Sequence, residues 1–455
     1  MMAPMHLAGV CERLNGTLIH GDAEFSNVCI DTRQLQAGDL FIALKGPNFD
    51  GHSFVEKARQ MGAVAVIVEH QVDSELPQLV VENSRDALGL LGLLNREAFK
   101  GLTLAMTGSA GKTTVKEMSA AIMAQLGNTL ATKGNFNNEL GAPLTLLRLN
   151  SAHQFAVIEL GASSIGEIAY TSELVKPDVA IITNAAEAHI EGFGSLNNVV
   201  QAKGEIIDAL AADGVVVLNA DDLNAYKWKA RAGERRQLMF SLRDDQGADF
   251  YARGYQLQAN GGYAFEMVCP LGTITISLQH LGQHNVANAL AAAAATSELG
   301  ATLPQIKAGL ESVSPVPGRL TASTLANGAR LINDSYNANP ESLRAAIDVL
   351  AQCAGHSILV LGDMAELGDT AVHDHQEAAR YALSKGIGNL MTLGSLSAHA
   401  AREFGPQGHA FEDHDSLIET LRNRMNSNTT VLVKGSRSAH MERVVEAFMA
   451  GEVKC

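Results

Sequence analysis

Thr107-Gly108-Ser109-Ala110-Gly111-Lys112-Thr113-Thr114 is the stretch that decides the fold. The apolar run 102–106 before it predicts a buried strand, and residues 115–126 after it predict a helix. A strand, a glycine-rich turn, Lys-Thr and a helix form the layout of a phosphate-binding loop. In such a loop, backbone N–H groups, the positive end of the helix and Lys112 converge on one anion, and Thr113 can offer its hydroxyl to Mg²⁺. We call residues 107–114 the phosphate loop.

The phosphate loop departs from the usual pattern at one position. Where a glycine is expected five places before Gly111, the chain has Met106. This shortened variant makes an ordinary kinase or GTPase a poorer interpretation. A glycine-rich turn with an unrelated lysine is the alternative, and the strand and helix on the two sides of the turn argue against it.

Composition limits the class of protein. A chain of 455 residues is too long for one core and predicts two to four domains. The net charge of −15 argues against nucleic acid as the main partner, although a local positive site is enough for a nucleotide. The five cysteines are scattered and form no CxxC motif, which predicts reduced thiols in a cytoplasmic protein. The sequence shows no leader and no long apolar run, which predicts a protein that is not inserted in a membrane.

Alternating strand and helix patterns organise the chain into three α/β domains. We expect a small N-terminal domain over 1–85, a central parallel-sheet domain with the phosphate loop over 86–316, and a Rossmann-like C-terminal domain over 317–455. Residues 237–278 predict a β meander appended to the central sheet. The segment 314–318 contains two prolines and a glycine and predicts a hinge.

Polar residues follow the predicted central strands, at the edge where such sheets bind ligands. Glu159 directly ends an apolar strand, where a carboxylate seldom helps stability, and this favours a metal-directed acid. His189 follows another strand and could bind a metal or simply satisfy a loop. Lys203 is expected to begin an amphipathic helix, with a solvent-exposed lysine as the alternative. Asn285 could cap a helix on which Asn288 faces the same direction one turn later.

The last domain and the first add further candidates. Arg319 follows the hinge and could reach a phosphate only if the third domain folds over the second. Asp334 follows a strand and points to a sheet edge where a ribose or base would lie. Residues 434–437 (Lys-Gly-Ser-Arg) form a second anion-binding turn suited to a carboxylate. Residues 31–33 and 50–52 are polar clusters beside strands, and surface turns explain them equally well.

The chain resembles the Mur ligase family over nearly its whole length. The resemblance rests on motifs in a fixed order: TGSAGKTT (107–114), GNFNNELG (134–141), IELG (158–161), AKGEI (202–206), GQHNVANA (282–289), PGR (317–319), NDSYNANP (333–340), LGDMAELG (361–368) and VKGSR (433–437), preceded by DTR (31–33), FIALKG (41–46) and DGH (50–52).

The resemblance implies a reaction. ATP would phosphorylate the terminal carboxylate of a UDP-N-acetylmuramoyl-tripeptide, and the amine of D-alanyl-D-alanine would attack the acyl phosphate, with ADP and phosphate released, as a step of peptidoglycan precursor synthesis. A monomer with these small-molecule partners, without nucleic acid, is expected. A sister ligase that adds a single amino acid, or glutamate to a folate, is one alternative. A non-enzymatic nucleotide switch is another.

The resemblance also assigns roles to residues. Lys112, Glu159, His189, Lys203 and Arg319 would be catalytic. Two Mg²⁺ are implied, held by Thr113, Glu159, His189 and Lys203, the last as a carbamate formed with carbon dioxide. The ATP site would comprise Thr107, Gly108, Ser109, Ala110, Gly111, Lys112, Thr113, Thr114, Asn285, Asn288, Arg319, Asp334, Tyr336 and Asn337. The UDP-substrate site would comprise Thr32, Arg33, Lys45, Asp50, Asn135, Asn137 and Asn138. The residues near the dipeptide would be Asp363, Lys434 and Arg437.

Overall fold

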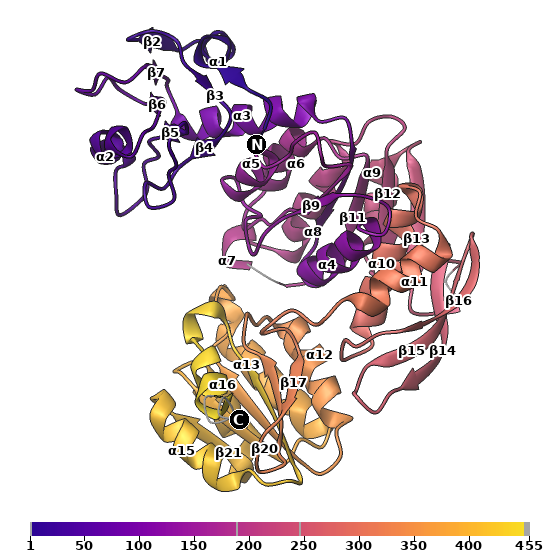
Figure 1. Ribbon diagram of the computed structural model, residues 1–455. Helices are drawn as coiled ribbons and strands as arrows, with labels where there is room; N and C mark the ends of the chain where they lie inside the picture. Colours follow the sequence, from indigo (N-terminus) through magenta and orange to yellow (C-terminus); the bar gives the residue numbers. More distant parts are fainter. Residues whose placement is uncertain (1, 188–189, 245–246, 450–455) are drawn as a thin grey trace.

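The computed structural model describes residues 2–187, 190–244 and 247–449. Three large sheets, each with helices packed on it, follow one another along the chain, and Figure 1 shows the three parts in sequence. This architecture confirms the predicted α/β class, with a small N-terminal part, a central part that carries the phosphate loop and a Rossmann-like C-terminal part. No helix within the described residues is long and apolar enough to cross a membrane.

The N-terminal part contains a mixed five-stranded sheet. Its strands, in spatial order, are β2 (Thr17–Ile19), β7 (Gln78–Val80), β6 (Ala65–Val68), β5 (Leu40–Ile42) and β4 (Val28–Cys29). All neighbours in it run parallel except β2 and β7. The remaining elements are the two-stranded sheet of β1 (Met5–His6) and β3 (Glu24–Phe25), α1 (Leu7–Leu14), the 3-10 helix η1 (Gly51–Phe54) and α2 (Val55–Gln60).

Helix α3 (Ser84–Ala98) connects the N-terminal part to the central part. Asn83 caps it by accepting hydrogen bonds from two backbone N–H groups of its first turn. Leu88 and Leu91 pack into the core of the N-terminal sheet, whereas Leu93 packs against a core of the central sheet. The predicted boundary at residue 85 therefore falls at the start of a helix that is shared by both cores.

The central part is a nine-stranded sheet in which β8 (Leu102–Thr107), the strand before the phosphate loop, lies among parallel neighbours. Alternate residues of β8 enter opposite cores. Leu104 and Met106 pack against the helices α4 (Lys112–Met123), α10 (His284–Glu298) and α11 (Leu303–Ser312), and Ala105 packs on the other face. That other face is covered by α5 (Gly141–Leu146), α6 (Glu167–Val175), α8 (Leu196–Gly204), η2 (Glu205–Ile207) and α9 (Ala225–Ala232).

The predicted β meander lies at one edge of the central sheet. From one edge to the other, the strands are β16 (Gly272–Ser277), β15 (Tyr263–Cys269), β14 (Phe250–Leu257), β13 (Arg236–Ser241), β12 (Val215–Asn219), β11 (Val179–Ile182), β8, β10 (Phe155–Glu159) and β9 (Thr129–Ala131). Strands β14 to β16 form the antiparallel meander, whereas β13 still pairs in parallel with both neighbours.

The C-terminal part is a six-stranded sheet, parallel except at the edge strand β17. Its strands, in spatial order, are β17 (Thr321–Thr324), β18 (Arg330–Asp334), β22 (Thr429–Lys434), β19 (His356–Gly362), β20 (Asn389–Leu393) and β21 (Gly408–Phe411). One face packs on α12 (Pro340–Ala351), α13 (Ala371–Ser384) and α14 (Ser397–Phe404), and the other on α15 (His414–Arg424) and α16 (Glu442–Met449). Short 3-10 helices are η4 (Gly368–Thr370), η5 (Gly405–Gln407) and η6 (Arg437–Ala439).

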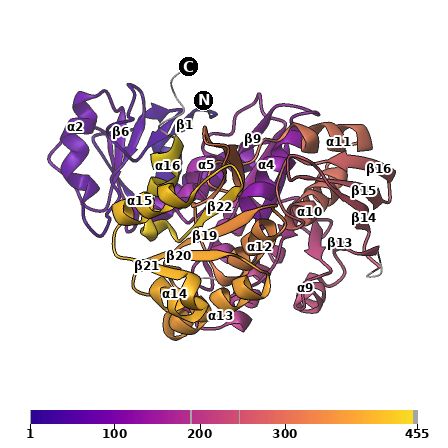
Figure 2. The ribbon, with the colours of Figure 1, turned by 90° about the horizontal axis from the view of Figure 1, so that it is seen from below.

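The C-terminal part lies beneath the central part, as Figures 1 and 2 show from two directions. The predicted hinge, residues 314–318, joins α11 to β17 and lies outside helices and strands. Two hydrogen bonds link the two parts: the Tyr263 hydroxyl lies 2.7 Å from Gln352 Oε1, and Arg330 Nη2 donates to the Asn260 carbonyl over 3.1 Å. Residues at the carboxyl edges of both sheets line one cleft.

Candidate active site

The cleft between the central and C-terminal parts has a volume of about 550 Å³. Residues 109–114 of the phosphate loop line one side of it, and Asp334, Tyr336 and Asn337 line the other. These residues all follow strands of two different sheets at their carboxyl ends, where α/β proteins bind ligands. The structure thus brings the residues predicted for ATP into one place.

Two glycines give the phosphate loop its shape. Gly108 has φ of +151° and Gly111 has φ of +83°, which L side chains rarely adopt. A Cβ at Gly111 would collide with Asn288 Oδ1, and one at Gly108 would collide with Thr183 Oγ1. Only glycine fits these positions, and Gly111 leads directly into α4, which begins at Lys112 rather than at the predicted residue 115.

The loop after β11 braces the phosphate loop. Thr183 Oγ1 donates to the Ala110 carbonyl over 2.6 Å, and Asn184 Oδ1 accepts from the Ala110 N–H over 2.9 Å. The N–H groups of the first turn of α4 have no partner within the helix and remain for a ligand. Sequence reasoning assigned no role to Thr183 or Asn184; their position immediately after a buried strand is the signal that could have identified them.

Lys112 lies across its own loop. Its Nζ donates to the Gly108 carbonyl over 2.6 Å. Burial lowers the pKa of Lys112, and the nearby carboxylate of Glu159 opposes that shift. The amine is therefore held at the phosphate loop in a site where a further anion would stabilise its charged form.

Glu159 is buried, with 2% of its surface exposed, and its two carboxylate oxygens differ. Oε1 accepts from Asn137 Nδ2 over 2.8 Å, whereas Oε2 is buried without a hydrogen-bond partner among the described residues. The Glu159 N–H donates to Thr132 Oγ1 over 3.0 Å, which fixes the end of β10. A buried carboxylate oxygen without a partner is costly unless a cation binds it, and it is a hard ligand of the kind that Mg²⁺ prefers.

Lys203 is buried, with 2% of its surface exposed, and the solvent-exposed alternative is therefore wrong. It lies near the end of α8 instead of beginning a helix, and its Nζ is 5.2 Å from the centroid of the Phe193 ring. Burial lowers the pKa of Lys203 to about 7, and the positive charge of Lys112 contributes in the same direction. His189 lies outside the described residues. Within those residues, no group of three His, Cys, Asp or Glu side chains could hold a metal.

Asn285 and Asn288 form a pair beside the phosphate loop. Asn285 Nδ2 donates to the Leu281 carbonyl over 2.7 Å, and Asn288 Nδ2 donates to Asn285 Oδ1 over 2.8 Å. Because α10 begins at His284 with Gln283 as its N-cap, Asn285 is not the cap, and that interpretation is wrong. Both asparagines line the cleft.

Arg319 spans the two parts. Its Nη2 donates to Thr113 Oγ1 over 3.0 Å, and its guanidinium stacks on the Tyr336 ring at 4.5 Å from the centroid. The condition set by the sequence, that the third domain must fold over the second, is met in this structure. The guanidinium therefore lies at the phosphate loop although it comes from the far side of the hinge.

Asp334 and Lys434 form a buried ion pair at the edge of the C-terminal sheet. Lys434 Nζ lies 2.6 Å from Asp334 Oδ2 and 2.9 Å from the Asn337 carbonyl. Burial raises the pKa of Asp334, and the charge of Lys434 opposes that shift. Lys434, which the resemblance placed near the dipeptide, thus lies against the ATP cleft and is held by Asp334.

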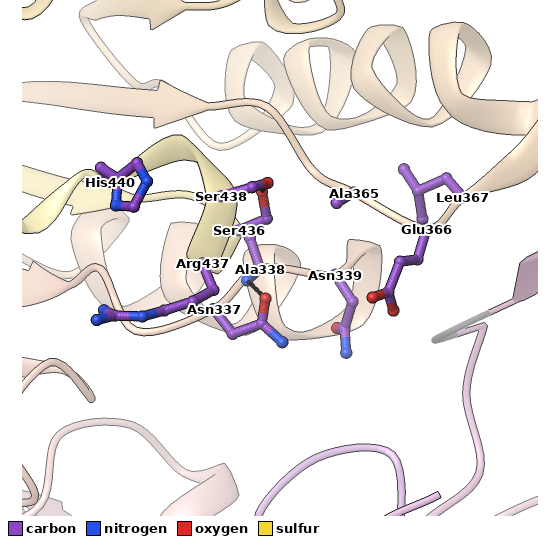
Figure 3. A pocket seen from close by; sticks show the side chains of 10 residues that line it. All are labelled: Asn337, Ala338, Asn339, Ala365, Glu366, Leu367, Ser436, Arg437, Ser438 and His440. Atoms are coloured by element: carbon purple, nitrogen blue, oxygen red, sulfur yellow. Dashed lines mark hydrogen bonds between the residues drawn. The ribbon is translucent and has the colours of Figure 1, made fainter. Parts of the chain in front are cut away.

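A second pocket of about 420 Å³ lies on the C-terminal part, between the loops that follow β18, β19 and β22. In Figure 3 the side chains of Arg437, Asn337, Asn339 and Glu366 extend to the same side of it. Asp363 does not line this pocket. Its carboxylate accepts from the backbone N–H of Ser397 over 2.7 Å and so binds the start of α14.

The residues predicted for the UDP substrate occupy three loops, which follow β4, β5 and β9, and one arginine joins the second loop to the third. Arg85 Nη2 donates to the Lys45 carbonyl over 3.2 Å, and its Nη1 lies 3.3 Å from Glu139 Oε1. Thr32 is buried. The other predicted residues make local contacts: Arg33 pairs with Asp31, Asp50 accepts from His52, the Asn135 carbonyl accepts from the Asn137 N–H, and Asn138 Oδ1 accepts from Gly141 N–H.

Comparisons with known proteins match the whole chain. Three family models match: the Mur ligase family catalytic domain over residues 24–91, the Mur ligase middle domain over 106–296, and the Mur ligase glutamate ligase domain over 318–437. The UDP-N-acetylmuramoyl-tripeptide–D-alanyl-D-alanine ligase of Escherichia coli (strain K12) is 44% identical over 449 residues, which cover 98% of this chain and 99% of that protein.

Solved structures agree with this match. A crystal structure of MurF from Acinetobacter baumannii is 36% identical, covers 99% of both chains and has a TM-score of 0.93. The MurF ligase of Thermotoga maritima in complex with ADP is 29% identical, covers 93% of this chain and 97% of that one, and has a TM-score of 0.84. The chain belongs to the Mur ligase family.

Proposed function

We propose that this chain joins D-alanyl-D-alanine to UDP-N-acetylmuramoyl-tripeptide, with ATP converted to ADP and phosphate, in cytoplasmic peptidoglycan precursor synthesis. The chain is an ATP-dependent ligase. The observation that carries the proposal is the cleft itself: a phosphate loop, a buried carboxylate oxygen without a partner among the described residues and an arginine from the C-terminal part meet in one place. Full-length identity to ligases of this activity supports the substrates.

The chemical problem is to bring two anions together. The triphosphate of ATP and the carboxylate of the tripeptide repel each other, so fixed cations must face both. Lys112 and the start of α4 would hold the β- and γ-phosphates, and Arg319 would contact the γ-phosphoryl group that moves. Positioning reactants in this way can lower a barrier by roughly 7–11 kcal/mol.

The donor atoms present fit a magnesium site. Glu159 Oε2 and the Thr113 hydroxyl would hold one ion together with phosphate oxygens, and His189 and Lys203 would hold a second. Mg²⁺ bound there would neutralise phosphate charge while the phosphoryl group is transferred. Glu159 Oε2, which has no hydrogen-bond partner in the part of the chain that the structure describes, supports the first of these assignments.

Lys203 would serve as a carbamate. A neutral amine can attack carbon dioxide, forming an N–C bond and releasing a proton, and the product is an anionic oxygen ligand. The pKa of about 7 supports this role because a large share of the amine is neutral at pH 7. In protein equilibrated with ¹³C-bicarbonate, NMR should detect a carbamate signal in wild type and in Lys116→Met, another buried lysine, but not in Lys203→Met. A signal that persists in Lys203→Met would contradict the assignment.

The three parts would divide the substrates among them. Residues 1–85 would bind the UDP end, 86–316 would bind ATP, and 317–455 would bind the dipeptide in the second pocket. There Arg437 would take the dipeptide carboxylate, and Glu366 would face its ammonium group before attack. Glu366 supports this polarity because its carbonyl accepts from Glu191 N–H, so its end of the pocket contacts the central part, which would bind ATP.

A coupled ADP-release assay tests the proposal. With ATP, Mg²⁺ and UDP-N-acetylmuramoyl-tripeptide, we expect rapid ADP release on addition of D-alanyl-D-alanine and slow release with D-alanine, D-glutamate or diaminopimelate. Equal rates with a single amino acid would indicate a sister ligase. ADP release that no UDP-peptide affects would favour a nucleotide switch.

A further inference from the structure

His280 is a buried histidine that no assigned role accounts for. It lies in the segment between β16 and α10, lines the cleft and has 4% of its surface exposed. Neither Nδ1 nor Nε2 has a hydrogen-bond partner in the described parts of the chain. Buried polar atoms are nearly always paired in folded proteins, so two unpaired nitrogens at a ligand cleft indicate a partner that the protein itself does not supply.

The position of His280 along the cleft indicates which part of ATP it would meet. Asn288 touches the phosphate loop at Gly111, and His284 lies one turn nearer the start of the same helix. At 1.5 Å per residue, four residues correspond to roughly 6 Å along the helix. His280 lies four residues before that start, and its ring is close enough to His284 to act on that residue's pKa, so it belongs to the His284 end of the helix rather than to the Asn288 end at the phosphate loop. A nucleotide anchored at the phosphate loop would extend its nucleoside in this direction.

The cleft that His280 lines includes apolar residues that suit a purine base. Phe240 and the part-exposed Leu242 line it as well, and Leu242 offers apolar surface to the face of a flat ring. Burial lowers the pKa of His280 to about 4, and burial also lowers that of His284 to about 4, so both rings are neutral at pH 7. A neutral imidazole has one N–H donor and one acceptor nitrogen. The edge of adenine likewise combines an amino donor with ring-nitrogen acceptors.

We infer that His280 hydrogen-bonds the polar edge of the adenine base of ATP and makes nucleotide affinity depend on the base. This inference rests on the ATP binding of the proposed function and goes beyond it by naming a base-reading residue. His280 lies outside the GQHNVANA motif at 282–289, so the motifs that carry the family resemblance do not point to it.

Calorimetric titration of the full chain with ADP and with inorganic pyrophosphate, both with Mg²⁺, tests the inference. His280→Phe keeps an aromatic ring and removes both nitrogens. Loss of one or two hydrogen bonds at a buried site predicts ADP binding about fivefold to tenfold weaker, with pyrophosphate binding unchanged. The matched control is His409→Phe. His409 Nε2 is also buried without a partner among the described residues, but it lies on β21, outside the cleft, and both affinities should stay as in wild type.

Three results would overturn the inference. The first is an ADP affinity of His280→Phe within twofold of wild type, and the second is an equal loss of affinity for ADP and for pyrophosphate in that variant. The third is an equally large loss of ADP affinity in His280→Asn, which keeps a donor and an acceptor. Wild-type protein that binds pyrophosphate but no ADP would overturn the base contact alone. Wild-type protein that binds neither would overturn ATP dependence and the inference with it. Failure of ligation with intact ADP binding would count only against the proposed reaction.

A measurement on wild-type protein removes dependence on the folding of variants. The ring ¹⁵N signals of His280 should shift on addition of ADP, because a ring nitrogen gains a hydrogen bond, and should stay in place on addition of pyrophosphate. Signals that respond equally to both ligands would contradict the base contact.

Discussion

Two sheet edges face each other across the cleft, and they treat charge in opposite ways. On the central edge, Glu159 keeps one buried carboxylate oxygen without a partner among the described residues, and Lys112 is buried against its own loop. On the C-terminal edge, Asp334 and Lys434 neutralise each other over 2.6 Å. The difference teaches that ligand completes the charges of Glu159 and Lys112, whereas the Asp334–Lys434 pair is complete by itself. Substitutions on the central edge should therefore cost activity, and substitutions in the ion pair should cost stability.

Lys112→Met should give the largest effect. Removing the cation at the phosphates should lower ATP turnover by about 10³ to 10⁵, the range seen when a single positive charge on a transferring phosphoryl group is lost. Stability should be unchanged or higher because a buried charge is removed. Turnover in the coupled assay and the unfolding midpoint in urea check both parts. A loss of turnover of only tenfold, or a large loss of stability, would contradict the view that Lys112 acts on ligand rather than on the fold.

Lys434→Met should destabilise the fold by about 3–5 kcal/mol, because it leaves the buried charge of Asp334 without a partner. The double variant Asp334→Asn with Lys434→Met should recover most of this loss. Urea unfolding of the two single variants and the double variant measures the coupling. Additive effects would show that the pair does not hold the C-terminal edge together.

Glu159→Gln should lower kcat by about 10² to 10³ and weaken the dependence of the rate on Mg²⁺, because a neutral amide is a poor magnesium ligand. The remaining amide oxygen can still accept from Asn137, so the unfolding free energy should change by no more than about 1 kcal/mol. Rates across a magnesium titration test the first expectation. An unchanged magnesium dependence would remove Glu159 from the metal site.

Lys203 predicts a pH dependence of stability. Below pH 7 the amine is charged in the folded and the unfolded protein; between pH 7 and 10.5 only the unfolded protein keeps the proton. The unfolded state then binds more protons, so stability rises with pH in that window, by about 1.4 kcal/mol per pH unit at most. Lys203→Met should be more stable than wild type at pH 7, and the gap should narrow towards pH 9 in buffers free of carbon dioxide. A constant gap would show that Lys203 is not desolvated.

Arg437→Ala should give the smallest effect, about a tenfold rise in KM for D-alanyl-D-alanine with KM for ATP unchanged. Its ion pair with Glu442 has a separation of 3.4 Å and is largely exposed, so stability should hold. Arg443→Ala, a nearby exposed arginine, is the control and should change neither KM. A rise in KM for ATP instead would place Arg437 at the ATP cleft, beside Lys434.

Local patterns explain what could be predicted without the structure. The phosphate loop, the parallel strands and the hinge depend on residues close together in the chain, and the structure confirms the fold they predict. Errors occurred where a residue's surroundings come from distant segments. Lys203 looked like a surface residue, and Asn285 like a helix cap, because neither burial nor a partner four residues upstream can be read from a short motif.

The sequence by itself determined the α/β class, the phosphate loop and the family, since glycines, strand periodicity and motif order act over a few residues. Only the tertiary structure decided that Arg319 reaches Thr113, 206 residues away, that Lys434 belongs to Asp334, 100 residues away, and that His280 is buried at the cleft. Such contacts depend on how the three sheets and their helices pack against one another. Packing brings together charged residues that are far apart in the chain, and no local motif indicates that they will meet.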